Sequence, residues 1–248
     1  MIILKNSSDI ERMREANRIL AHLFEHIRPM IQPGITTAEL DSEAELFIRS
    51  HNAVPAFKGY RGFPSTLCTS VNEEVVHGIP GTRRLRSGDL VSIDVGALHE
   101  GFYSDAARTF AVGQVSKQAL NLMETTKKAL NAGINQAYPG NRLSDISCAI
   151  QQVVESEGFS VVRDFVGHGI GKGLHEDPQI PNFGKKGNGP VLKEGMTFAI
   201  EPMVNQGSWR IEILADGWTA VSSDRSLSAH FEDSIAVTKD GPLILSTL

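Results

Sequence analysis

The sequence has 248 residues, of which 41% are hydrophobic and 21% charged, so it can bury a core without disulfide staples. Its 24 Lys and Arg against 29 Asp and Glu give a net charge of −5, which argues against nucleic acid as the main ligand. Two cysteines exclude a disulfide framework, and no apolar run approaches the roughly 18 residues of a membrane span. We therefore expect a soluble cytoplasmic protein with no membrane partner.

The N-terminal part of the chain predicts two helices, each opened by a capping box. In the first box Ser8 caps the amide of Glu11, whose side chain reaches back to Ser8. A turn at Pro33-Gly34 precedes the second box, which pairs Thr36 with Glu39. Apolar residues follow each box at helical spacing, so the chain is expected to begin with two packed helices.

Strands are expected after these helices. Residues 55–80 contain short β-type runs separated by Gly and Pro. Leu90–Val95 is an apolar run typical of a buried strand, and Glu100-Gly101 marks a turn. Residues 102–112 then pair with that strand as a hairpin.

The same order of elements occurs a second time. Residues 117–137 have a helical pattern, Pro139-Gly140 forms a turn, and residues 146–154 predict another helix. Short strands and Gly-rich loops make up the rest. The order of helix, helix and strands therefore occurs twice in one chain.

A short motif supports an internal repeat. Residues 85–94 read Leu-x-x-Gly-x-x-x-x-Ile followed by Asp, and residues 192–201 repeat this pattern, ending in Glu, at an offset of 107 residues. We predict one catalytic domain over residues 1–248, built from pseudo-repeat halves at approximately 1–112 and 113–248. The expected class is α/β (α+β), with two similar αα-β halves around a shared central site.

Four acidic residues lie in or beside apolar strands, where a carboxylate is costly unless it is paired, protonated or bound to metal. Asp94 ends the first buried strand, and Asp105 lies on the returning limb of the hairpin, where it can face Asp94. Glu201 ends the repeated strand, and Glu232 precedes an apolar strand run. The four together exceed what solvated surfaces explain.

Three histidines lie in Gly-rich or Pro-bounded turns, namely His77, His168 and His175. The segment around His168 lacks Gly-Lys-Ser/Thr, so a phosphate loop is disfavoured and close backbone approach to a histidine is the better interpretation. In contrast, His22 and His26 lie off the apolar stripe of the first helix and predict a solvated face. The first three are therefore the candidate functional histidines.

Four carboxylates and one imidazole suit a pair of divalent ions such as Mn, Fe, Co or Zn, and four negative ligands neutralise two such ions. Two metals can activate a water and polarise a carbonyl together. No Gly-x-Ser-x-Gly and no Cys in a catalytic context compete with this interpretation. The residues thus predict amide hydrolysis at a dinuclear centre.

The motifs Ser-Ile-Asp-Val-Gly, Tyr-Ser-Asp-x-x-Arg-Thr, Gly-His-Gly-Ile-Gly, His-Glu-x-Pro and Ile-Glu-Pro together resemble type I methionine aminopeptidase, in its short bacterial form without a zinc-finger extension. The resemblance covers essentially the whole chain. It implies the pseudo-two-fold "pita-bread" fold with a central curved antiparallel sheet. It also implies a metallo-exopeptidase that removes the initiator methionine of nascent proteins and peptides when the second residue is small.

The resemblance implies a dinuclear metal site of unspecified Co, Mn, Fe, Zn or Ni. Asp94 would bind one ion, His168 and Glu201 the other, and Asp105 and Glu232 both. The nucleophile would be the water activated by both metals. The catalytic residues are expected to be Glu201 as the base and, as hydrogen-bond donors to the scissile amide, His77 and His175.

A snug apolar methionine pocket is also implied. Its expected lining is Phe57, Tyr60, Phe63, Cys68, Leu174 and Trp218, although family members often carry Cys, Tyr and Phe in place of Phe57, Phe63 and Leu174. Alternation along a strand further predicts that His230 points to the same face as Glu232, where it can tune a metal ligand or only line the rim. Relatives commonly carry Gln at that position.

Two alternative functions stay open at this point. One is a non-catalytic pita-bread protein that binds a partner, and the other is a peptidase similar to aminopeptidase P or prolidase. The full ligand set argues against the first, and the lack of room for an extra N-terminal domain argues against the second. The single basic cluster, residues 82–86, favours a solvated loop over a transient ribosome contact. The family suggests a monomer.

Overall fold

The first helix begins at a side-chain cap that lies two residues before the expected one. In the computed structural model, which describes residues 1–248, α1 (Ser7–Ile27) is capped by Asn6. The Asn6 Oδ1 accepts from the Asp9 amide at 2.9 Å, and Asp9 Oδ2 accepts from the Asn6 amide at 3.2 Å. The predicted box of Ser8 with Glu11 is therefore wrong, because the same three-residue spacing occurs earlier and Asn caps a helix as well as Ser does.

The other helices follow the sequence pattern closely. The predicted box of Thr36 with Glu39 is confirmed and begins α2 (Thr37–Ser50). The second half carries α3 (Lys117–Ile134), three residues shorter at its end than expected, and α4 (Leu143–Ser156). The short 3-10 turns are η1 (Arg28–Met30) and η2 (Tyr60–Gly62). None of these helices has the length and apolar character that a membrane crossing requires.

Nine strands form a central sheet in which all neighbours are antiparallel. The order is β1-β4-β5-β14-β9-β7-β8, with β2 also paired to β4 and β15 to β14. The strands are β1 (Val54–Pro55), β2 (Leu67–Val71), β4 (Leu90–His99), β5 (Phe102–Ala111), β7 (Gly167–Gly169), β8 (Glu176–Ile180), β9 (Thr197–Ile200), β14 (Glu232–Thr238) and β15 (Gly241–Ile244). The predicted hairpin is confirmed as β4 and β5, and β5 and β14 join the two halves at the middle of the sheet.

Two smaller sheets complete the fold, each with three strands. One has the order β13-β10-β6 and the other β11-β12-β3. Their strands are β3 (Glu74–Val76), β6 (Ser160–Val161), β10 (Met203–Asn205), β11 (Ile211–Ile213), β12 (Ala220–Ser222) and β13 (Ser228–His230). The break between β13 and β14 at Phe231 moves the chain from a small sheet into the central one.

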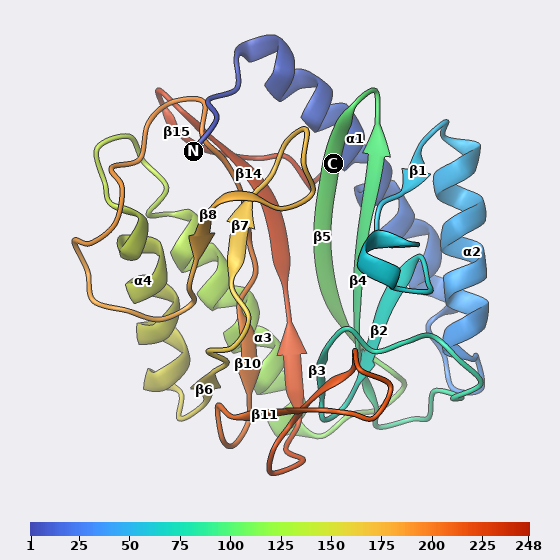
Figure 1. Cartoon of the computed structure of the whole chain (residues 1–248). Helices are drawn as coiled ribbons and strands as arrows, with labels where there is room; N and C mark the ends of the chain where they lie inside the picture. Colours follow the sequence, from blue (N-terminus) through green and yellow to red (C-terminus); the bar gives the residue numbers. More distant parts are fainter.

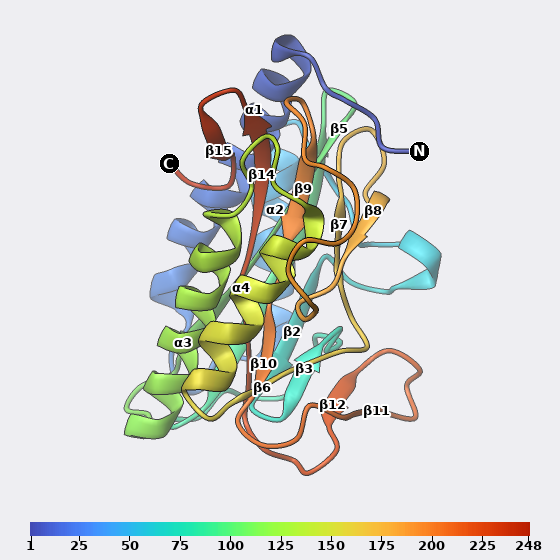
Figure 2. The same cartoon turned by 90° about the vertical axis from the view of Figure 1, so that its left-hand side faces the viewer.

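All four helices pack on one side of the curved sheet, whereas η2 and the hairpin of β11 with β12 project on the other side (Figures 1 and 2). Two large apolar clusters lie between the helices and the central sheet. One joins α1 and α2 to β4 and β5, and the other joins α3 and α4 to β9 and β14. The α/β architecture with a curved antiparallel sheet is thus confirmed, and the helix-free side is left for a site.

The repeated motif adopts the same local geometry in both halves. The Gly88 amide donates to the Val112 carbonyl at 2.9 Å, and the Gly195 amide donates to the Val237 carbonyl at 2.9 Å. Both glycines have left-handed backbones, with φ of 104° and 87°, which a residue with a Cβ rarely adopts. Each turn leads into a strand that ends at or passes an acidic residue, so the two halves direct carboxylates to the same region.

Candidate metal centre and pocket

Two carboxylates come from the β4–β5 hairpin. Asp94 pairs with Ala107 across the hairpin and Asp105 with Gly96, so the two acids are diagonal neighbours on one face. The Asp105 residue is 3% exposed, and one carboxylate oxygen of each acid is buried without a hydrogen-bond partner. The predicted juxtaposition of these two side chains is therefore present.

Two further carboxylates come from the second half. Glu201 directly follows β9, and Glu232 is the first residue of β14. The register pairs Asp233 with Ile200, so both glutamates lie at adjoining strand ends. Glu232 is 2% exposed, and its Oε1 has no partner.

His168 faces these acids from β7. Its Nδ1 is 2.9 Å from the Gly169 carbonyl, which can only accept, so Nδ1 carries the proton and Nε2 keeps its lone pair. The Nε2 lies 3.7 Å from Asp105 Oδ2 and 3.7 Å from Glu201 Oε1. One ligand atom each from Asp105, His168 and Glu232 lies within 4.8 Å of the other two. This fixed tautomer is the one that a metal ligand needs.

The electrostatics of the cluster call for a cation. Burial first, and mutual repulsion second, raise the pKa of Asp105, Glu201 and Glu232, and burial also raises that of Asp94. Burial lowers the pKa of His168 to about 4, so its imidazole is neutral near pH 7. Neighbouring carboxylates with unpartnered oxygens and a neutral imidazole fit divalent metal ions.

An apolar cavity of about 200 Å³ opens directly above these acids. Cys68 pairs with Asp94 across β2 and β4, and a Cβ at Gly96 would lie 2.8 Å from the Phe57 ring. The pocket wall therefore touches the acidic floor. The six predicted pocket residues all line the cavity, namely Phe57, Tyr60, Phe63, Cys68, Leu174 and Trp218. The predicted histidines and all four predicted acids line it as well, namely His77, His168, His175, Asp94, Asp105, Glu201 and Glu232.

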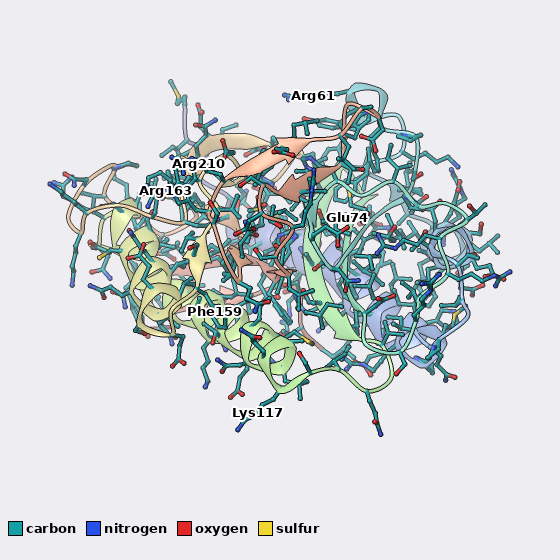
Figure 3. The ribbon with its side chains drawn as sticks, turned by 90° about the horizontal axis from the view of Figure 1, so that it is seen from below. Arg61, Glu74, Lys117, Phe159, Arg163 and Arg210 are labelled. Carbon is teal, nitrogen blue, oxygen red and sulfur yellow. The ribbon has the colours of Figure 1, made fainter.

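Three lining residues were missed from the sequence: Arg61, Phe165 and Val166. Phe165 contacts the His77 ring edge-on, with centroids 5.2 Å apart. Their position directly before or within Gly-rich segments is the single signal that could have pointed to them. Seen from below, Arg61 lies on the side of the molecule opposite Lys117 of α3 (Figure 3).

The two donor histidines occupy different surroundings. His77 has a φ of 60°, a strained backbone for a residue with a Cβ, and burial lowers its pKa to about 4. His175 is more exposed, and its Nδ1 lies 2.9 Å from the Tyr60 hydroxyl. The His175 ring lies 4.3 Å from the His168 ring, centroid to centroid, so it reaches the edge of the acidic cluster.

His230 lies near the cluster but outside the cavity wall. It ends β13 in the small sheet rather than sharing a strand with Glu232, because the chain breaks at Phe231. Its Nε2 is buried without a hydrogen-bond partner, 3.8 Å from Glu201 Oε2. The simple alternation argument gives the right neighbourhood for the wrong reason.

Arg108 supports the centre from the helix side. Its guanidinium donates to the Glu232 main-chain carbonyl and, at 2.5 Å, to the Asp233 carboxylate. The same group lies 5.4 Å from the centroid of the Phe24 ring of α1. One cation thus joins the first helix to the strand end that carries Glu232.

Comparisons with known proteins agree with this architecture. Residues 11–239 match metallopeptidase family M24. The methionine aminopeptidase of Clostridium perfringens is 55% identical over 100% of both chains, and methionine aminopeptidase 1 of Bacillus subtilis is 53% identical over 99% of both. The methionine aminopeptidase structure from Thermotoga maritima has a TM-score of 0.98 at 46% identity and covers 100% of both chains. The prolidase from Pyrococcus furiosus shares the fold at 24% identity, with a TM-score of 0.79, 99% of this chain and 66% of that one covered.

Proposed function

The chain belongs to metallopeptidase family M24 and, within it, to the methionine aminopeptidases, and we propose how its own residues carry the reaction. It removes the initiator methionine of proteins. In our proposal the cavity holds that methionine, and cleavage follows when the second residue is small. The observation that carries this assignment is a buried acidic cluster with unpartnered oxygens at the floor of an apolar pocket.

We assign five side chains as ligands of two divalent cations. Asp94 would hold one cation, His168 and Glu201 would hold the other, and Asp105 and Glu232 would contribute to both. The three unpartnered carboxylate oxygens and the fixed tautomer of His168 support this set. When bound, such cations acidify a water molecule and polarise the scissile carbonyl. Mn, Fe, Co, Ni and Zn all suit four carboxylates and one imidazole.

Glu201 is the residue that we assign to accept the proton of the attacking water. Its carboxylate lines the cavity and lies 3.7 Å from His168 Nε2, at the border between the acidic floor and the open space. The same group can return a proton to the leaving amine, since a carboxylic acid formed there faces the cleaved bond.

His77 and His175 are assigned to hydrogen-bond the scissile amide and its tetrahedral intermediate. Both line the cavity, and burial keeps His77 neutral near pH 7. A neutral imidazole donates one hydrogen bond without bringing a charge into the apolar pocket. Donors held in place before the reaction stabilise the developing charge at no cost of reorganisation.

The methionine side chain is proposed to lie among the aromatic residues. Phe63 and Trp218 meet edge to face with centroids 5.1 Å apart, and Phe63, Cys68 and Leu174 are each less than 5% exposed. A thioether gains about 0.3–1.5 kcal/mol from each sulfur–aromatic contact. A pocket of about 200 Å³ admits one such side chain and little else.

His230 is proposed to position Glu201. Its buried Nε2 lies 3.8 Å from Glu201 Oε2, and its main chain is fixed by Thr109, whose Oγ1 accepts from the His230 amide at 2.9 Å. A histidine held this firmly restrains the carboxylate beside it, as supporting groups do around many metal sites.

We further propose that the enzyme acts as a monomer in the cytoplasm, on the N-terminal methionine of nascent polypeptides. Contact with the ribosome would be transient. A peptide substrate needs no membrane or nucleic-acid surface, and the net charge of −5 agrees with that.

The decisive assay measures methionine release from Met-Ala-Ser by metal-loaded protein, with and without a chelator. We expect release that the chelator abolishes and that added Mn or Co restores. A non-catalytic binder would release nothing, and a prolidase-like enzyme would cleave Ala-Pro in preference to Met-Ala-Ser. Either result would overturn the proposed function.

A further inference from the structure

A buried ion pair joins the N-terminal segment to the loop that carries His175. The Lys5 Nζ lies 2.5 Å from Glu176 Oε2, and the two side chains are 5% and 11% exposed. The pair lies outside the wall of the cavity, so neither charge serves the substrate directly. Both residues are distant in sequence and meet only in the folded chain.

The second oxygen of Glu176 closes the loop on itself. Its Oε1 accepts from the Gly173 amide at 2.9 Å. Between Gly173 and Glu176 lie two residues, Leu174 and His175, and both line the cavity. We name these two residues the loop tip. Glu176 therefore ties the base of the loop tip, and Lys5 fixes Glu176.

Two glycines give Lys5 the room that this contact needs. A Cβ at Gly171 would lie 2.4 Å from Lys5 Cε, and a Cβ at Gly195 would lie 2.6 Å from the Lys5 carbonyl oxygen. The Lys5 amide also donates to the Gly195 carbonyl at 2.7 Å. The side chain of Lys5 thus packs against Gly171 and its main chain against Gly195, and a side chain at either glycine would clash with Lys5.

One residue of the loop tip, Leu174, is anchored in the pocket wall, where it is 3% exposed and packs in an apolar cluster. His175 is exposed, and the Tyr60 hydroxyl is the one hydrogen-bond partner of its ring. Its ring also lies 4.3 Å from the His168 ring, centroid to centroid, and is carried by the main chain between Gly173 and Glu176. A buried ion pair adds little stability over an apolar pair, but it fixes direction and distance strictly.

We infer that Lys5 is a positioning residue for the reaction, acting through Glu176 on the placement of His175. This inference rests on the proposed role of His175 at the scissile amide. Small displacements of a reacting group are costly in rate, about 10²-fold for roughly 1 Å. Lys5, more than 160 residues before the loop tip in the sequence, thereby becomes part of the active-site support.

The test is a double-mutant cycle between Lys5→Met and His175→Ala, measured as kcat on Met-Ala-Ser with saturating metal. Lys5→Met keeps the aliphatic stem and removes the charge. We expect it to lower kcat about tenfold in the wild-type background and less than about twofold in the His175→Ala background, because the effect passes through His175. An equal loss in both backgrounds would overturn the inference.

A matched control separates positioning from general destabilisation. Leu130→Ala removes a core side chain of α3, 2% exposed and remote from the loop tip. At a temperature well below both melting points, this variant should keep its kcat while Lys5→Met loses it. Equal losses in the two variants would contradict the inference. Should His175→Ala itself leave kcat unchanged, the proposed role of His175 fails, and should the wild-type protein release no methionine, the proposed function fails, so both failures are distinct from failure of the inference.

A second measurement does not depend on activity. Hydrogen exchange at the Gly173 amide, followed in metal-free protein, reports the bond to Glu176 directly. Lys5→Gln, a milder change in case Lys5→Met does not fold, should speed this exchange at least about tenfold relative to amides of α3. Unchanged exchange at Gly173 would show that Lys5 does not fix the loop tip.

Discussion

The two halves of the molecule use the same turn to reach the centre but deliver their acids differently. In the first half, Asp94 and Asp105 are diagonal neighbours within one long hairpin. In the second half, Glu201 and Glu232 lie at the adjoining ends of two strands. A hairpin holds its acids by a continuous ladder, whereas strand ends need outside support, and Arg108 supplies it at Glu232.

The halves also differ in what they add around the acids. The apolar wall comes equally from both halves, with Phe57 and Phe63 from the first and Leu174 and Trp218 from the second, whereas His168 and His175 come from a Gly-rich segment of the second half alone. Under the proposed function, both halves therefore contact the methionine side chain, and each supplies one histidine, His77 or His175, to the scissile amide. The two halves thus share a scaffold but differ in the residues that they place around the acids.

The largest expected effect is the loss of a ligand shared by both cations. Asp105→Asn removes one negative charge from the middle of the cluster, so we expect metal content to fall below one ion per chain and activity to drop further than in any other variant named here. Elemental analysis of the purified protein measures this. Asp94→Asn, which changes one cation only, is the matched control, and full occupancy in Asp105→Asn would refute the ligand set.

The next largest effect tests the second half alone. His175→Ala should lower kcat by about 10²–10³, the usual cost of losing one donor to a tetrahedral intermediate. Metal content should stay intact, since this side chain is assigned to the substrate. Retained activity together with lost metal would reverse the assignment, and paired kinetics and elemental analysis distinguish the two outcomes.

A smaller effect concerns stability in the absence of metal. The acids have raised pKa values, about 7 for Asp94, so their contribution is full below the unfolded values near 4 and is lost as pH rises through the folded values. The buried histidines, with pKa values lowered to about 4 or about 3, oppose this only below their unfolded value near 6.5.

The informative window therefore begins at about pH 6.5. Between there and about pH 8, chelated protein should lose roughly 5 °C in melting temperature. Metal-loaded protein should change little, because cations stabilise the ionised acids. Thermal unfolding followed by circular dichroism checks this, and a chelated protein that gained stability over the same window would contradict it.

The smallest expected effect is at His230. Its pKa is lowered to about 3 by burial, so the ring is neutral at working pH and acts on Glu201 by contact rather than by charge. His230→Gln keeps a polar group there and should weaken metal binding about tenfold. Calorimetric metal titration and the pH–rate profile measure the effect. If both are unchanged, the residue only fills space.

Much of this site is predictable because its signals are local. A carboxylate in an apolar run is costly unless it has a partner, so the sequence alone indicates Asp94 and Glu201 as candidate ligands, although β4 continues past Asp94 to His99. The hairpin that brings Asp105 beside Asp94 follows from one turn and two apolar runs. Helices follow from spacing, and the error at the first cap came from two possible capping boxes that overlap within residues 6–11.

What the sequence could not predict depends on long-range geometry. The break at Phe231 places His230 in a different sheet from Glu232, and no periodicity reveals it. The contact of Lys5 with Glu176 is likewise visible only once the fold brings the two segments together. Phe165 lines the pocket because of where β7 begins, which is a property of the sheet rather than of the residue.

Arg108 carries a consequence for mutational surveys of this protein. Because its guanidinium touches both the Phe24 ring and the Glu232 carbonyl, a change in the packing of α1 is transmitted to the strand end that faces the cavity. Substitutions that alter turnover should accordingly be found on the outer helical layer, far from any substrate, and residue 24 is the first position at which to look.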